Sequence, residues 1–423
     1  MSAPPRLADA IARVTAAGTP RPTESAALGD TLGRVLAHDI IAPRSLPPWP
    51  NAGMDGYAVR AADIRGTQDG SAISLRVIGT VPAGTMPRVA VEPGTAVRIF
   101  TGAPMPAGAD TVVRWEDTDR GIDVVQVRRD RDAHQHVRPA GNDAVAGDVA
   151  LLSGMRITPA VQQYLASLGL RHVPVARRPV VALVRSGDEL VPLDRADEAT
   201  DARIVDSNAV ALAAIVREAG GILLDLGVIP DDEASLALAL GRAAREADVL
   251  VSAGGVAAGD FDFAKGAAAR AGGTVAFWKM AARPGSQLCF GEVGAVPWLG
   301  LPGNPVSATV CGELLLRPLL RAMAGDPSPH RPTHLAPAGE TLTRDPRVAL
   351  LLRVRLDEAP DGTRQLVRSG GQASHLLRPL ALADGLACVA PGAAPIDSGV
   401  LVPYVAFADH GGARHVPFGA AAT

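Results

Sequence analysis

The residues that could do chemistry gather first in one stretch, residues 248–262. It opens with a short apolar run rich in β-branched residues, which predicts a buried parallel strand. Gly254 and Gly255 end the strand, and adjacent glycines let a backbone turn tightly and expose N–H groups to phosphate or oxyanions. Asp260 and Asp262 follow and suit Mg²⁺, which takes one or two carboxylates with substrate phosphates. A glycine-rich turn with solvated aspartates is the alternative for this stretch alone.

Strand and helix patterns alternate from residue 180 onward and predict the sheet that would carry this stretch. The expected strands are short apolar runs at residues 180–184, 222–229, 249–252, 275–279 and 297–301. The expected helices have apolar residues at helical spacing and cover residues 207–219, 232–247 and 306–323. Ser207 and Asp232 are the expected N-caps of the first two helices. Such alternation specifies a parallel sheet covered on both faces.

The carboxyl ends of these strands would meet at one rim, where sheets of this kind bind ligands. The loops at this rim carry carboxylates, cations, glycines or a helix start, and they are residues 186–189, 231–232, 254–262, 279–287 and 301–307. Each loop alone would be routine. Together they predict an anion site combined with a metal site.

The regions outside this sheet predict two further kinds of domain. Helices are expected at residues 7–16, 31–37 and 158–169, the last opened by Thr158 and Pro159. Short β-rich runs lie at residues 73–78, 96–100, 111–115 and 122–127. Further strands with Gly/Pro turns are expected at residues 348–356, 365–368, 386–390 and 400–407.

The fold class expected is therefore α/β combined with all-β domains in a multidomain chain. We expect an N-terminal domain in two segments (1–46 and 138–176), an inserted β domain (47–137), a parallel-sheet α/β domain (177–325) and a C-terminal β-barrel-like domain (326–423). A chain of 423 residues is too long for one hydrophobic core, which agrees with this division.

Composition excludes several classes of function. The net charge is −3 and no basic block is present, so we expect no nucleic-acid partner. Cys289, Cys311 and Cys388 are far apart, which argues against a disulfide framework or a zinc site and for a reducing compartment. No signal pattern or membrane-length apolar run is visible. We expect a cytoplasmic protein without a membrane partner.

Lysine is almost absent from an arginine-rich chain. Lys265 and Lys279 are the only lysines among 41 basic residues. Their survival in one segment suggests a need for a compact point charge there, with chance clustering as the alternative.

Several motifs occur together in one order and resemble a known family. They are Met54-Asp-Gly-Tyr-Ala-Val59, Thr101-Gly-Ala-Pro104, Ser186-Gly-Asp-Glu-Leu190, Ser252-Ala-Gly-Gly-Val256, Phe277-Trp-Lys279 and Gly300-Leu-Pro-Gly-Asn-Pro-Val-Ser307. In this order they resemble the molybdopterin molybdenumtransferases, which include the gephyrin E domain. The resemblance runs from about residue 7 to the C-terminus.

The resemblance implies an α/β domain of the molybdopterin-binding type and a homodimer whose site is shared between subunits. The implied reaction uses adenylated molybdopterin and molybdate, inserts molybdenum and releases AMP with Mg²⁺ as cofactor. Further implied partners are the molybdopterin adenylyltransferase and apo-molybdoenzymes.

The resemblance also implies roles for residues of this chain. The implied catalytic residues are Asp55, Glu189, Asp231, Asp262 and Lys279. The implied Mg²⁺ ligands are Asp188, Glu189, Asp231 and Asp262, which offer hard oxygens. The implied substrate-binding residues are Thr101, Arg138, Asp143, Ser186, Gly254, Gly255, Arg283, Pro302, Gly303, Asn304, Pro305 and Ser307. Molybdate is a dianion, so Lys279, Arg283 and Arg138 are its expected electrostatic partners.

The chain departs from the family pattern at a few positions. Ser286 stands where the family commonly has a second lysine, and Ala253 and Ala257 stand where serines are common. The basic cluster around Arg138 is also reduced. Two hypotheses therefore follow: an active molybdenum-inserting enzyme, or a diverged carrier that binds and delivers molybdopterin without inserting metal.

Overall fold

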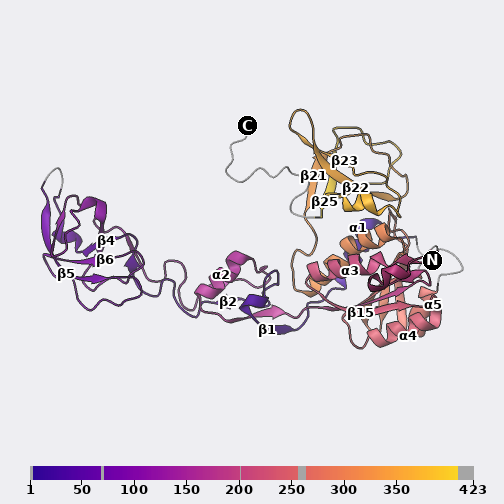
Figure 1. Ribbon diagram of the computed structural model, residues 1–423, viewed down its shortest axis with the longest axis horizontal. Coiled ribbons are helices and arrows are strands. Elements are labelled where there is room, and N and C mark those ends of the chain that lie inside the picture. The colour runs from indigo at the N-terminus through magenta and orange to yellow at the C-terminus, as the bar shows by residue number, and fades with distance from the viewer. Residues whose placement is uncertain (1–2, 68–70, 201, 256–262, 408–423) are drawn as a thin grey trace. The chain divides into compact units, whose positions relative to one another are not determined.

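The protein is described by a computed structural model, which covers residues 3–67, 71–200, 202–255 and 263–407 (Figure 1). It divides into two compact units. The first unit comprises Met1–Glu24, Gly33–Val35 and Val175–Thr423, and the second Ser25–Leu32 and Leu36–Pro174. The chain passes between the units within β1 (Thr23–Ala27) and β11 (His172–Ala176), and also on either side of Gly33–Val35. The finer division into four domains stays a prediction.

The first unit is built on a six-stranded sheet with the order β15-β12-β16-β20-β19-β17. Its strands are β12 (Val180–Ser186), β15 (Ile222–Ile229), β16 (Val249–Ala253), β17 (Gly273–Trp278), β19 (Cys289–Val293) and β20 (Val296–Leu301). The pairs β15–β12, β12–β16 and β16–β20 are parallel, as predicted.

The prediction of an entirely parallel sheet is wrong at β19. This strand, absent from the sequence-based expectation, runs antiparallel to both β20 and β17. Gly294 and Ala295 join β19 to β20 and both have positive φ, 56° and 66°. A two-residue turn with both central residues at positive φ matches the right-handed twist of a hairpin. The tight hairpin places β19 between β20 and β17, so β17 still points in the parallel direction.

Helices cover both faces of this sheet, as predicted. Alternate residues of β16 divide between two hydrophobic clusters. Val249 and Val251 pack with α3 (Ser207–Glu218) and with the helical segments of residues 305–323, whereas Leu250 packs with α4 (Glu233–Ala243) and α5 (Ala264–Arg270). Figure 1 shows α3 and α4 on opposite sides of β15. The helices are α1 (Leu7–Ala16), α3 (Ser207–Glu218), α4 (Glu233–Ala243), α5 (Ala264–Arg270), α6 (Pro305–Cys311) and α7 (Arg317–Met323). A π-helical segment, η5 (Gly312–Leu316), joins α6 to α7.

Several predicted helices need correction. The helix expected over residues 31–37 is wrong, because the chain forms the short 3₁₀ helix η1 (Leu28–Asp30) and then turns. Asp206, not Ser207, is the N-cap of α3 and accepts a hydrogen bond from the Ala209 N–H. Asp232 caps α4 as predicted, but this helix ends at Ala243. Small elements beside α3 are β13 (Leu190–Val191), η4 (Leu193–Glu198) and β14 (Ile204–Val205).

The C-terminal region of the first unit is a second sheet, as predicted. Its order is β18-β22-β24-β25-β21, with β23 paired to β22. The strands are β18 (Ala282–Arg283), β21 (Thr333–Pro337), β22 (Ala349–Glu358), β23 (Arg364–Arg368), β24 (Gly385–Val389) and β25 (Leu401–Ala406), with helix α8 (Leu377–Ala381). β18 belongs to the loop after β17, yet it pairs in parallel with β22 through Ala282–Ala349 and Arg283–Leu350. One loop of the α/β sheet is therefore also a strand of the C-terminal sheet.

The second unit contains a five-stranded sheet with the order β7-β4-β6-β5-β8. Its strands are β4 (Gly56–Val59), β5 (Ile73–Val81), β6 (Thr95–Ile99), β7 (Thr111–Arg114) and β8 (Val124–Val127). The short pairs are β2 (Ile40–Ile41) with β10 (Val149–Leu151) and β3 (Asn51–Ala52) with β9 (Val137–Arg138). The helices are η2 (Ala61–Asp63), η3 (Trp115–Asp117) and α2 (Pro159–Ser167), the last capped by Thr158 as predicted.

Candidate active site

Three parallel strands bring predicted site residues together at one rim. Arg185 pairs with Ala253, and Ala253 pairs with Leu301, so the chain leaves β12, β16 and β20 side by side. Ser186 and Gly254 are the next residues along their strands. We expected these loops to meet because parallel strands end at the same edge. The strand register confirms this, because it places the ends of β12, β16 and β20 side by side in one row.

The row depends on a close backbone approach at Gly254. Its φ is +95°, and a Cβ there would lie 2.4 Å from the Ser186 carbonyl oxygen. Gly255 also has a positive φ, +69°. Glycine is needed at Gly254 for both reasons, since other residues rarely adopt this φ. The Gly254 N–H donates to the Leu301 carbonyl over 3.2 Å. It therefore ties two strands together and is not the free anion donor that the sequence suggested.

A residue that the sequence analysis missed completes this rim. Asn208 lies in the first turn of α3, and its Nδ2 donates to the Gly303 carbonyl oxygen over 2.8 Å. The N-cap Asp206 is held by Arg185 Nε over 2.8 Å, and Arg185 also forms an ion pair with Asp225. The signal was present in the helix start at residues 206–208, where the expected cap was Ser207.

The predicted carboxylates lie in the loops after β12 and β15. Asp188 and Glu189 are exposed and follow β12 directly, and Asp231 is partly buried and follows the neighbouring strand β15. The fourth, Asp262, lies outside the described residues. Within the described residues, no group of three His, Cys, Asp or Glu side chains is arranged to hold a metal ion.

Lys279 has an uncommon backbone conformation directly after β17. Its φ is +72°, and its N–H donates to the Leu288 carbonyl over 2.8 Å. Non-glycine residues at positive φ carry a conformational cost and cluster at functional sites. The structure thus gives a physical reason to single out this lysine, beyond the scarcity of lysine in the chain.

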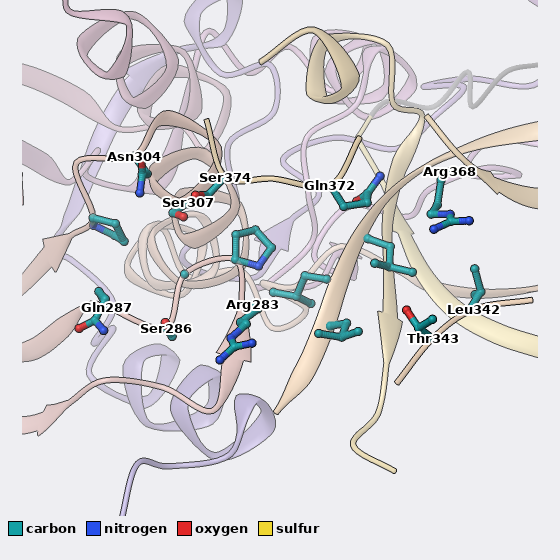
Figure 2. A pocket seen from close by; sticks show the side chains of 16 residues that line it. Arg283, Ser286, Gln287, Asn304, Ser307, Leu342, Thr343, Arg368, Gln372 and Ser374 are labelled. Atoms are coloured by element: carbon teal, nitrogen blue, oxygen red, sulfur yellow. The ribbon is translucent and has the colours of Figure 1, made fainter. Parts of the chain in front are cut away.

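A cavity of about 440 Å³ lies between the rim and the C-terminal sheet. Figure 2 shows Gln287, Asn304 and Ser307 on one side of it and Leu342, Thr343 and Arg368 on the other. Its polar lining residues are Arg283, Ser286, Gln287, Asn304, Ser307, Thr343, Arg368, Gln372 and Ser374. Its apolar lining includes Pro302 and three leucines of β22. Pro305, the first residue of α6, lies in the sequence between the lining residues Asn304 and Ser307.

The cavity contains two arginines with carboxylate partners. Arg283 Nη1 lies 3.5 Å from Asp345 Oδ2, and Arg368 Nη2 lies 2.5 Å from Glu340 Oε2. Hydrogen bonding to Arg368 holds the pKa of Glu340 below its ordinary value. Each guanidinium has five N–H donors, so both keep donors for an anion. These remaining donors can hydrogen-bond an anion in the cavity.

The sequence analysis missed the C-terminal contribution to this cavity. Ser374 accepts a hydrogen bond from the Val306 N–H over 3.3 Å, which ties the C-terminal loop to the start of α6. Behind this loop, the fully buried Arg353 donates to the carbonyl oxygens of Gly371 and Ala373 over 2.9 and 3.1 Å. Nothing local in this segment marks it as part of a site, because its contacts are long-range.

The second unit holds the remaining predicted site residues. Asp55 Oδ1 accepts hydrogen bonds from both the N–H and the Oγ1 of Thr101, each over 2.7 Å. These bonds, the backbone one first, hold the pKa of Asp55 below its ordinary value. Arg138 Nη2 lies 3.5 Å from the Gly53 carbonyl oxygen. Asp143 is exposed, and its N–H donates to the Leu46 carbonyl.

Comparison with known proteins defines the class. Residues 6–169 match the MoeA N-terminal region (domain I and II), residues 182–322 a probable molybdopterin binding domain, and residues 336–407 the MoeA C-terminal region (domain IV). A crystal structure of a molybdopterin biosynthesis MoeA protein from Pyrococcus horikoshii is 29% identical with a TM-score of 0.79, and the match covers 95% of this chain and 99% of that one. The fold is thus that of the MoeA proteins.

Curated relatives specify the family. Molybdopterin molybdenumtransferase 2 of Mycobacterium tuberculosis is 40% identical over 84% of this chain and 87% of its own length. The molybdopterin molybdenumtransferase of Haemophilus influenzae is 34% identical over 75% of this chain and 77% of its own length. The chain belongs to the molybdopterin molybdenumtransferase family. It is a transferase of molybdenum cofactor biosynthesis, which favours the enzyme hypothesis over the carrier.

The close approach at Gly254 gives a stability prediction. Gly254→Ala should lower the free energy of unfolding by about 1–3 kcal/mol, because the new Cβ meets the Ser186 carbonyl and the positive φ is strained. Gly303→Ala is the matched control: its Cβ would lie 3.8 Å from the nearest atom, and its φ is not positive. It should change stability by less than about 0.5 kcal/mol. Urea titration checks both, and equal losses would contradict the steric argument.

The Asp55–Thr101 contact gives a pH prediction. Thr101→Val removes the hydroxyl bond and should raise the pKa of Asp55 part of the way toward its ordinary value, whereas Thr101→Ser should leave it low. Because the folded pKa is depressed, the stabilisation is present above the unfolded pKa and is lost as pH falls through the folded pKa. Thr101→Val should therefore reduce that loss. Carboxyl-carbon NMR titration measures the change, and identical titrations of all three proteins would exclude the hydroxyl as a cause.

Proposed function

We propose that this enzyme inserts molybdenum from molybdate into adenylated molybdopterin and releases AMP, with Mg²⁺ as cofactor. The observation that carries the proposal is the arrangement in the first unit, where a close-approach backbone rim adjoins a cavity lined by two arginines. One substrate needs a place for phosphate groups, and the other is a tetrahedral dianion. The two adjoining regions suit these two substrates.

The rim is our proposed place for the phosphate groups of adenylated molybdopterin. Gly255 and Gly303 bring backbone close to these phosphate groups, and Ser186 is a further proposed contact to the substrate. The cavity is our proposed place for molybdate, with Arg283 and Arg368 as cations and Ser286 and Ser374 as neutral donors. Lys279 follows β17 and starts the loop that carries Arg283. Its ammonium suits charge that develops on oxygen during transfer.

The described donors fit Mg²⁺ in number and kind. Asp188 and Glu189 are exposed beside the rim, and Mg²⁺ commonly takes one or two carboxylates with substrate phosphates and water. Asp231 and Asp262 are the further proposed ligands. When bound, Mg²⁺ would neutralise charge on the phosphoanhydride. Asp188 and Glu189 would hold the ion, and the rim backbone would orient the phosphates.

The second unit supplies the remaining part of the proposal. Asp55, Thr101, Arg138 and Asp143 belong to it, so we propose that a homodimer completes the site with these residues from the partner subunit. We also propose a cytoplasmic location, with the adenylyltransferase and apo-molybdoenzymes as partners before and after the reaction. Within the described residues, no helix has the length and apolar character needed to cross a bilayer.

AMP release tests the proposed reaction. Wild type should release AMP from adenylated molybdopterin faster with molybdate than without it. Glu189→Gln should reduce this rate at least about tenfold, or roughly 1.4 kcal/mol in barrier, through loss of a carboxylate beside the anhydride. Glu246→Gln, on an exposed carboxylate just after α4, should leave the rate unchanged. Molybdopterin binding without any AMP release would instead support the carrier.

The cavity lining gives a test of the molybdate site. Ser286→Lys adds a cation near Arg283 and should lower the molybdate concentration for half-maximal AMP release several-fold, since a further cation strengthens the attraction for a dianion. Higher salt should remove part of the gain. Ser328→Lys adds the same charge at an exposed position outside the cavity lining and is the control. Equal effects of both lysines would refute a local role for the cavity.

A further inference from the structure

Two buried oxygens at the rim have no hydrogen-bond partner within the described part of the chain. They are Ser186 Oγ and Asn208 Oδ1. Ser186 is 7% exposed and Asn208 is 9% exposed, so bulk water reaches neither residue freely. Buried polar atoms are nearly always paired, and one left unpaired costs free energy. Two such atoms at a rim that also holds Gly254, Gly255 and Gly303 indicate that a bound molecule supplies their partners.

The orientation of the Asn208 amide is fixed by its neighbour. Asn208 lies 2.8 Å from the Gly303 carbonyl oxygen, which can only accept a hydrogen bond. The NH₂ group must therefore face Gly303, and Oδ1 faces the other way. An amide oxygen is itself only an acceptor. Its partner must donate through N–H or O–H.

The Ser186 hydroxyl, which can accept such a hydrogen bond, lies at the same group of glycines. Its Oγ lies 2.9 Å from the point where a Cβ of Gly254 would stand and 3.3 Å from that of Gly255. Gly303, which Asn208 holds, lies against Gly254, since a Gly303 Cβ would be 3.8 Å from the Gly254 Cα. Contacts thus connect the Ser186 and Asn208 side chains to the same glycine backbone, although they come from different elements, β12 and α3.

We propose that Ser186 Oγ and Asn208 Oδ1 form an acceptor pair that recognises an N–H or O–H donor group of the substrate, while Asn208 Nδ2 positions Gly303. A phosphate dianion has no proton to donate, so Asn208 Oδ1 does not contact the phosphate groups, and we assign the Ser186 hydroxyl, which can accept as well as donate, to the same neutral group. The pair recognises a neutral hydrogen-bond donor beside the phosphate groups, either a pterin N–H or a ribose hydroxyl. Asn208 is thus a specificity-determining residue as well as a positioning residue. This inference rests on the proposed function, because that proposal supplies the substrate.

Equilibrium binding to the full chain tests the pair with three probes. Free molybdopterin carries pterin N–H donors, AMP carries ribose hydroxyls, and sulfate is a dianion without a donor at neutral pH. Ser186→Ala should weaken binding of one donor-bearing probe about three- to tenfold and leave sulfate unchanged, as expected for loss of one neutral hydrogen bond. The probe whose binding is weakened identifies the part of the substrate that carries the donor group. Ser207→Ala, an exposed serine next to Asn208, is the matched control and should change nothing.

Two variants separate the functions of Asn208. Asn208→Asp keeps an oxygen acceptor but loses the donor to Gly303, so it should weaken all three anionic probes alike. Asn208→Ala loses both groups and should weaken the donor-bearing probe about three- to tenfold more than it weakens sulfate. Circular dichroism and the Tm verify that each variant is folded. Should Asn208→Ala not fold, the binding data for Ser186→Ala alone test the inference, because this substitution removes only the hydroxyl group and keeps the Cβ.

The outcomes distinguish this inference from the proposed function. Wild-type binding of molybdopterin or AMP that Ser186→Ala leaves unchanged would overturn the acceptor pair and leave the proposed function standing. An equal loss for sulfate and for the donor-bearing probe in Asn208→Ala would reduce Asn208 to a positioning residue and overturn its role in recognition. Wild type that binds neither molybdopterin nor AMP would overturn the proposed function and this inference together.

Discussion

The contact on which the site depends is the approach of the Gly254 backbone to Ser186. It brings the ends of β12 and β16 closer than any side chain at position 254 would allow. The Gly254 N–H then bonds Leu301, which adds the end of β20 to the same row. The Asn208 amide group then positions Gly303, in the loop after β20, through a hydrogen bond to its carbonyl oxygen. The rim is therefore held mainly by backbone contacts, with one side-chain contact from Asn208.

A second constraint connects this rim to the C-terminal sheet. Ala282 and Arg283 leave the α/β sheet and pair with Ala349 and Leu350 of β22. On the opposite side of the cavity, the Val306 N–H bonds the Ser374 carbonyl. Both contacts are between main-chain atoms, so they hold the cavity walls together whatever side chains line them. This permits changes such as serine at position 286 without loss of the cavity frame.

The sequence predicted the parts of the fold that depend on local pattern. Alternating strands and helices gave the parallel core of the sheet, and glycine and carboxylate loops gave the rim. The antiparallel strand β19 was missed because it is short, contains Gly291 and depends on a turn formed by Gly294 and Ala295. The false helix over residues 31–37 has helical apolar spacing, but tertiary contacts override it: the Leu36 N–H bonds the Met155 carbonyl, far along the chain.

Site residues could be predicted from the sequence only where they belong to a recognisable motif. Arg368 and Ser374 lie in strands and turns of ordinary composition, and only the folded chain brings them to the cavity. Asn208 was hidden for a different reason, because a polar residue at a helix start resembles a cap. The bond to Gly303 that distinguishes it spans 95 positions. Long-range hydrogen bonds of this kind leave no periodicity in a sequence.

The pairing of β18 with β22 has a consequence for how this fold can diversify. A β-strand that belongs to one domain by sequence and to another by hydrogen bonding cannot be inherited with either alone. A chain that ended near residue 325 would leave Ala282 and Arg283 without the strand with which they pair. Residues 279–288 and the C-terminal region should therefore be inherited together.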